Sequence, residues 1–130
     1  MAVPLALIGS AGCSLDGSHQ PKPAKGPARD AAVAIDRLER ASGRGDWRTV
    51  CDDIFSTGAR RRAGGRDCAR LLRSDAGSLA RPRIDVLGIV VKGDHAEVRV
   101  RSRARGQPPL VDVIELRRER GAYRVDALSG

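Results

Sequence analysis

The sequence predicts an α+β fold in which three helices pack on one face of a four-stranded antiparallel sheet. Before Pro82 the apolar residues recur at helical spacing, whereas after Pro82 they recur with the period of two that strands show. Only short turns separate the strand segments, as in an antiparallel meander that helices cover on one side. With 130 residues, the chain has room for one compact domain.

The first helix is predicted in ARDAAVAIDRLERASGRG, where apolar side chains share one helical face. That face consists of Ala31, Ile35, Leu38 and Ala41. Gly43 and Gly45 end the helix. Asp46 then occupies the N-cap position of a second helix, WRTVCDDIF, because an aspartate oxygen can accept a bond from the first backbone N–H groups. Its apolar face consists of Trp47, Val50, Cys51 and Ile54.

The segment TGARRRAGG is predicted to be a loop or a frayed turn between the second and third helices. The third helix follows in RDCARLLRSDAG, with Asp67 as its cap and with inward-facing side chains at Cys68, Leu71 and Leu72. The second and third helices would thus each present a cysteine on a buried face.

Four strands follow. Residues 84–91, IDVLGIVV, are apolar on both sides and predict a strand that is covered on both faces. HAEVRVRSRA comes next, after a turn at Lys92-Gly93-Asp94. Its Ala96, Val98 and Val100 would face the core, and His95 would face solvent with the intervening charged residues. GQPP and RGAY make the turns that lead into LVDVIELRRE and YRVDAL.

The N-terminal stretch predicts an export signal. Residues 2–12 are uncharged and mostly apolar, and as a helix they would rise only about 16 Å, too short to cross a bilayer. The following Ser10-Ala11-Gly12-Cys13 resembles a bacterial lipobox, whose cysteine carries a diacylglycerol and becomes the first residue after cleavage. We therefore expect a signal peptide at 1–12, the anchor cysteine Cys13 and a tether at 13–27, and the folded domain at 28–130. The alternative is a buried N-terminal strand or helix with an ordinary cysteine.

Cys51 and Cys68 remain if Cys13 carries lipid. In an exported protein such a pair predicts one disulfide, with two free buried thiols as the alternative. The spacing of these cysteines is not that of a zinc site, and His19 and His95 are far apart in the sequence, so no metal site is predicted. No catalytic arrangement of side chains stands out either.

The net charge of +8 predicts an anionic partner. Nucleic acid is disfavoured because the whole chain has one Trp, one Tyr and one Phe to stack on bases. An anionic lipid, a wall polymer or an acidic protein fits better. Arg99, Arg101 and Arg103 would project from one sheet face as a basic surface, or simply as a solvated outer face. Such a row of like charges opposes self-pairing and favours a monomer, unless acids such as Glu97 and Glu115 interleave with it.

Four segments together resemble the nuclear-transport-factor-2-like (cystatin-like) superfamily, and more closely its small exported actinobacterial lipoproteins. They are GDWRTVCDDIF, DCARLL, VKGDHAEVRV and ERGAYRVDAL. The resemblance covers residues 28–130 and implies a curved sheet that forms a helix-walled cone able to hold a small hydrophobic ligand. Trp47, Phe55, Asp112 and Tyr123 are the candidate pocket residues. Isomerases and cyclases of this superfamily use such a cone, and the isomerase-like members use an aspartate base with a tyrosine and a second acid as an oxyanion hole.

The sequence therefore predicts a non-catalytic domain without a cofactor. Its location would be the extracytoplasmic face of the cell membrane, where a lipid anchor would hold it while it binds a small ligand or an anionic envelope partner. Three alternatives stay open: an accessory envelope lipoprotein without a ligand, an isomerase- or cyclase-like enzyme that uses the cone pocket, and nucleic-acid binding through the basic surface.

Overall fold

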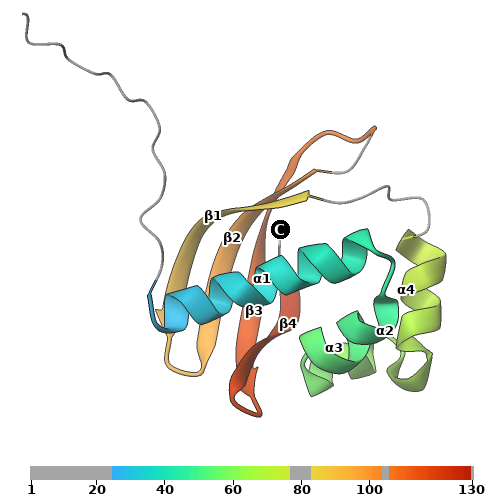
Figure 1. Cartoon of the computed structure of the whole chain (residues 1–130), viewed down its shortest axis with the longest axis horizontal. Coiled ribbons are helices and arrows are strands. Elements are labelled where there is room, and N and C mark those ends of the chain that lie inside the picture. Colours follow the sequence, from blue (N-terminus) through green and yellow to red (C-terminus); the bar gives the residue numbers. More distant parts are fainter. Residues whose placement is uncertain (1–24, 77–82, 104–105, 130) are drawn as a thin grey trace, which may run out of the picture.

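A computed structural model describes residues 25–76, 83–103 and 106–129. Helical elements come first and four strands follow (Figure 1). The helical elements are α1 (Pro27–Gly43), α2 (Trp47–Thr49), a π-helical segment (Val50–Ile54), α3 (Thr57–Arg62), a 3-10 turn (Gly65–Asp67) and α4 (Cys68–Ala76). The strands are β1 (Arg83–Lys92), β2 (His95–Arg103), β3 (Leu110–Glu119) and β4 (Ala122–Ser129). The predicted α+β order is confirmed, with more helical elements than expected.

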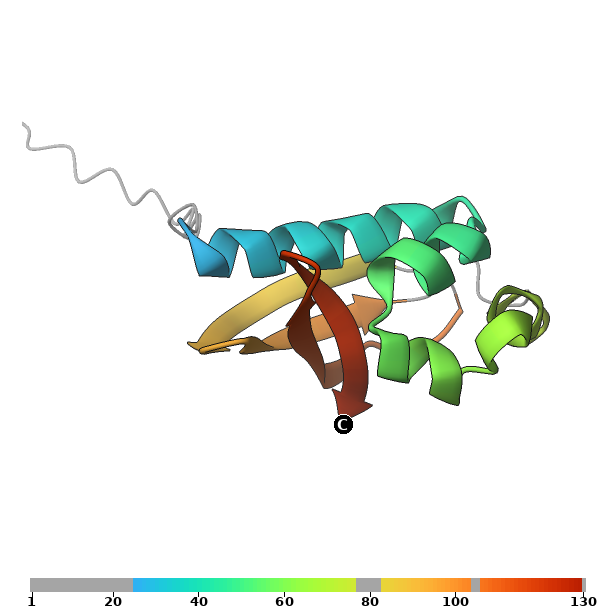
Figure 2. The same ribbon diagram turned by 90° about the horizontal axis from the view of Figure 1, so that it is seen from below.

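The four strands form an antiparallel sheet in the order β1-β2-β3-β4. The sheet is strongly curved, and α1 lies across its inner face, as the two views in Figures 1 and 2 show. The core lies between α1 and this face. Its buried side chains include Ile35, Val50, Val98, Val100, Ile114 and Leu116. Removing these apolar side chains from water is the main stabilising contribution to such a two-layer domain.

Helix α1 has the face that the sequence predicts. Pro27 stands at its first turn, where a missing backbone N–H costs nothing. Ala31, Ile35 and Ala41 are buried, and Leu38 packs against the core from a partly buried position. The Glu39 carboxylate accepts a hydrogen bond from the backbone N–H of Ile84, which joins α1 to the start of β1.

Asp46 caps α2 as predicted. Its carboxylate accepts hydrogen bonds from the Thr49 hydroxyl, at 2.7 Å, and from the Thr49 backbone N–H, at 3.3 Å. The pKa of the Asp46 carboxyl is lowered, chiefly by the hydroxyl bond, because both bonds favour the charged form. The helix then widens into the π-helical segment, where the Phe55 N–H donates to the Val50 carbonyl oxygen at 2.8 Å.

The prediction of a loop or frayed turn at TGARRRAGG is wrong, because residues Thr57–Arg62 form the capped helix α3. Ser56 accounts for the difference. Its hydroxyl accepts a bond from the Ala59 N–H at 3.0 Å, which caps the helix, and donates a bond of 2.6 Å to Asp126 on β4. Glu119 of β3 adds an acceptor for the Thr57 N–H. These partners are 62 and 70 residues away in the chain, so local sequence gives no sign of them.

Two expectations about burial are also wrong. Residues 84–91 do not form a strand that is covered on both faces: β1 is an edge strand, and its Val86, Leu87, Val90 and Val91 are exposed. A long apolar run does not by itself distinguish a central strand from an edge strand. Leu71 of α4 is exposed as well, whereas Cys68 on the same helix is buried. The expectation that Ala96, Val98 and Val100 face the core is confirmed.

Acid should destabilise the domain partly through Glu119. The carboxylate of Glu119 accepts two bonds of 3.0 Å, from the backbone N–H and the hydroxyl of Thr57, and the backbone bond in particular lowers its pKa below the ordinary 4.5. The unfolded chain therefore binds a proton at higher pH than the native protein does. The resulting stabilisation is complete above pH 4.5 and is lost as the pH falls through the lowered native value.

We expect Glu119→Gln to flatten the fall in melting temperature with decreasing pH over this window, while both proteins still melt cooperatively. Melting followed by circular dichroism across the acid range measures this. An unchanged acid profile in Glu119→Gln would show that the Thr57–Glu119 contact contributes nothing to the pH dependence.

Candidate functional site: the outer face of the sheet

Cys51 and Cys68 form a disulfide that joins the π-helical segment to the start of α4. The sulfurs are 1.99 Å apart and the Cα atoms 6.1 Å apart, and both residues are buried. The predicted pairing is thus confirmed, and the helices on which the two cysteines lie are held together covalently. Cys13, the predicted lipid-bearing residue, lies outside the described residues.

The register of the sheet assigns each strand residue to a face, because residues directly opposite in an antiparallel pair point the same way. Val98 and Val100 of β2 point inward and are buried, so Arg99 and Arg101 between and after them point outward. Arg103 lies on the same outer face. The structure therefore brings the three arginines of the predicted basic row together on one side of β2.

The cross-strand neighbours of this row are largely apolar. Arg99 lies opposite Gly88 and Val113, and Arg101 lies opposite Asp85 and Val111.

Asp85 forms a long ion pair with Arg103, 3.9 Å between Oδ2 and Nε, and both side chains are more than half exposed. A single carboxylate at this end of the face thus accompanies three guanidinium groups. Further along β2, Glu97 pairs with Lys92 at 3.3 Å.

Apolar side chains on both sides of the arginine row are the feature that sequence reasoning missed. Leu87 and Val90 of β1 are 41% and 53% exposed, and Val111 of β3 is 50% exposed. Leu87 follows the inward-facing Val86 and has no cross-strand partner at the bulge. The register shift at Val86/Gly88 then brings Val90 to the outer face, since Ile89 pairs with the inward-facing Val98. The only sequence signal of this bulge is Gly88 inside an apolar run. We call Leu87, Val90, Arg99, Arg101, Arg103 and Val111 the outer-face patch.

The four candidate pocket residues do not share one site. Asp112 lies opposite Val100 on the inner face, whereas Tyr123 lies opposite Arg118. Asp112 and Arg118 are six residues apart along β3, which corresponds to about 20 Å. Trp47 and Phe55 pack partly buried against the core, Trp47 at the start of α2 and Phe55 in an extended residue after the π-helical segment, where it forms a bridge with Val125. The expectation of a common pocket is therefore corrected: strand alternation predicts the face of Asp112 but not its distance from Tyr123.

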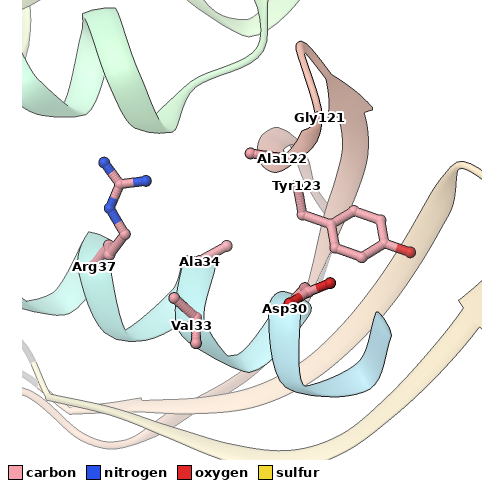
Figure 3. Close-up of a pocket in the computed structure, with 7 residues that line it drawn as sticks. All are labelled: Asp30, Val33, Ala34, Arg37, Gly121, Ala122 and Tyr123. Atoms are coloured by element: carbon pink, nitrogen blue, oxygen red, sulfur yellow. The ribbon is translucent and has the colours of Figure 1, made fainter. Parts of the chain in front are cut away.

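Tyr123 instead contributes to a surface pocket of about 170 Å³ beside the first turns of α1 (Figure 3). The pocket is lined by Asp30, Val33, Ala34, Arg37, Gly121, Ala122 and Tyr123. The Arg118 guanidinium lies 4.3 Å from the centre of the Tyr123 ring and 3.3 Å from the Asp30 carboxylate. The Tyr123 hydroxyl donates to the Gly93 carbonyl oxygen at 3.4 Å. These contacts join α1 to the sheet. The polar groups of Asp30, Arg118 and Tyr123 thus already have partners within the protein.

His95 is exposed on the outer face, as predicted. Within residues 25–76, 83–103 and 106–129, no three His, Cys, Asp or Glu side chains gather as a metal site would require. In the same part of the chain, no helix combines the length and the apolar character that crossing a bilayer would take.

No protein-family model matches this chain, and no curated protein matches it. Two solved structures are similar. One is a de novo designed protein with a curved β-sheet, with a TM-score of 0.52 and 19% identity over 77% of this chain and 99% of that chain. The other is the de novo designed NTF2 fold protein NT-9, with a TM-score of 0.54 and 14% identity over 80% of this chain and 87% of that chain. Helices packed on a curved four-stranded antiparallel sheet therefore form an NTF2-like fold here. At these identities, the likeness concerns the fold alone.

Proposed function

We propose that this protein is a lipid-anchored domain on the extracytoplasmic face of the cell membrane, and that it acts by binding an anionic envelope partner. Cys13 carries the lipid, residues 14–27 tether the domain, and residues 28–130 bind. The observation that carries the proposal is the buried Cys51–Cys68 disulfide, because such bonds persist in oxidising compartments outside the cytoplasm. The apolar run before Cys13 agrees with the same location.

Binding is favoured over catalysis by the placement of Asp112 and Tyr123. An isomerase-like site needs its aspartate and tyrosine around one substrate, and here the two lie at separate positions along the inner face. An anionic partner is favoured over a small apolar ligand by the arginines of the outer-face patch. Asp85 is the carboxylate beside Arg101 and Arg103, and Glu97, the outward neighbour of Arg99, is paired with Lys92.

Fatty-acid labelling tests the anchor. In the cells that make the protein, we expect a clickable fatty acid to label the wild-type chain and the chain to fractionate with the membrane. Cys13→Ala should lose the label entirely, because no other thiol stands at the lipidation position. Cys51→Ala is the matched control and should keep the label. An unlabelled wild-type chain, or a label that persists in Cys13→Ala, would overturn the proposal.

A further inference from the structure

We infer that the outer-face patch is a second membrane contact that binds the surface of an anionic phospholipid bilayer. The inference rests on the proposed function for one point, the location of the protein. That function places the domain at the extracytoplasmic face of the cell membrane, where it would meet the bilayer. The affinity of the patch for anionic lipid, however, is a property of the folded domain and does not require the Cys13 lipid.

The outer-face patch carries a row of positive charges. Arg99, Arg101 and Arg103 project from one side of β2 at successive outward positions. The nearby Asp85 offsets one of the three charges, and further along the same face Glu97 is paired with Lys92 and lies opposite Glu115. A row of guanidinium groups on an exposed surface suits phosphate headgroups, which accept their hydrogen bonds and carry the opposite charge. An anionic surface attracts each such cation, so a row of three multiplies the effect.

The apolar side chains decide between a bilayer and other anionic partners. Leu87 and Val90 lie on one side of the arginine row and Val111 on the other, with 41%, 53% and 50% of their surface exposed. A wall polymer offers charge but little hydrocarbon. A bilayer interface offers phosphate groups and, a few ångströms deeper, acyl chains, which is the combination that arginines flanked by aliphatic side chains match.

The position of the patch permits this contact. Figure 2 shows α1 on one side of the sheet, so the outer face is the side that α1 leaves open. Cys13 precedes Lys25, the first described residue, by twelve residues, and a chain of that length reaches at most about 43 Å. Strand β2 is 9 residues long, or about 30 Å. An anchored chain can therefore lie with its outer face against the bilayer that holds its lipid.

Vesicle co-sedimentation of the unlipidated full-length chain tests the inference. Cys13→Ala serves as the background, so that no lipid anchor contributes and every variant shares one N-terminus. We expect this chain to bind phosphatidylcholine vesicles that contain phosphatidylglycerol more tightly than vesicles of phosphatidylcholine alone. The difference should shrink as salt is raised, because salt screens exposed charges.

Three variants separate the contribution of the arginine charges to vesicle binding from that of the apolar side chains. Each variant is checked for an unchanged melting temperature. Arg99→Gln/Arg101→Gln should weaken binding to the anionic vesicles by about tenfold or more. Arg61→Gln/Arg66→Gln removes the same charge from exposed positions in the helical region and should change binding by less than about twofold. Val90→Asn/Val111→Asn keeps every charge and should weaken binding several-fold, because it removes apolar surface from the interface.

Equal binding to both kinds of vesicle, or equal losses in the two arginine variants, would overturn the inference. If Val90→Asn/Val111→Asn binds as the background does, the contact is purely electrostatic, which favours an acidic polymer or protein and contradicts a bilayer. None of these readouts depends on fatty-acid labelling at Cys13. A result that overturns lipid binding by the outer-face patch is therefore distinguishable from one that overturns the lipid anchor at Cys13.

Discussion

Replacing Leu116 with alanine will lower the free energy of unfolding by about 2–5 kcal/mol. Leu116 is fully buried near the middle of the sheet, where it lies opposite Ala96 on β2 and Val125 on β4. It belongs to the cluster that joins the sheet to Ile35 of α1. Truncation removes apolar contacts and leaves a cavity that strands on both sides prevent from closing.

Leu128→Ala is the matched control for this prediction. Leu128 is also a leucine of the inner face, opposite Ile114, but 70% of its surface is exposed. Its truncation should change the free energy of unfolding by no more than about 0.5 kcal/mol. Urea unfolding of both variants measures the difference. Similar losses at the two positions would mean that the inner face near Leu128 is as well packed as the core around Leu116, and would contradict the prediction.

Loss of the Cys51–Cys68 disulfide should cost about 3 kcal/mol. The bond closes a short loop between residues separated by 17 positions, and the chain-entropy model gives about that stabilisation for a loop of this length. For a domain of this size, the corresponding fall in melting temperature is about 12–20 °C. Cys51→Ala/Cys68→Ala tests the prediction by thermal melting, since both sulfurs are removed and no free thiol remains in the helices.

Chemical reduction provides an independent comparison. The wild-type chain treated with a reductant should melt near the temperature of Cys51→Ala/Cys68→Ala, and the same reductant should leave that variant unchanged. A wild-type chain whose melting is insensitive to reductant, although its thiols become alkylatable, would show that the bond contributes little to stability.

The parts of the fold that local patterns determine could be predicted from the sequence. The face of α1 and the alternation of β2 follow from the spacing of apolar residues, and the Asp46 cap follows from the preference of a helix start for an oxygen acceptor. Helix α3 could not be predicted, because its cap Ser56 is held by Asp126 from the far end of the chain. The exposure of β1 could not be predicted either, because edge position is a property of the whole sheet.

The candidate site, too, could be predicted from the sequence only in part. A period of two is enough to place Arg99, Arg101 and Arg103 on one face. The apolar flanks depend on which residues of β1 and β3 lie opposite the arginines, and the register shift at Val86/Gly88 moves Val90 to that face. Register and bulges arise from pairing between distant segments, so the amphipathic character of the outer face emerges only in the assembled sheet.

Intact mass of the natively produced chain is the decisive measurement for an anchored, oxidised envelope domain. We predict a mature chain that starts at Cys13, carries a diacylglycerol on that residue and is two hydrogens lighter than its reduced form, so that Cys51 and Cys68 resist alkylation until a reductant is added. Recovery of a soluble cytosolic chain that retains Met1 and has three alkylatable thiols would contradict it.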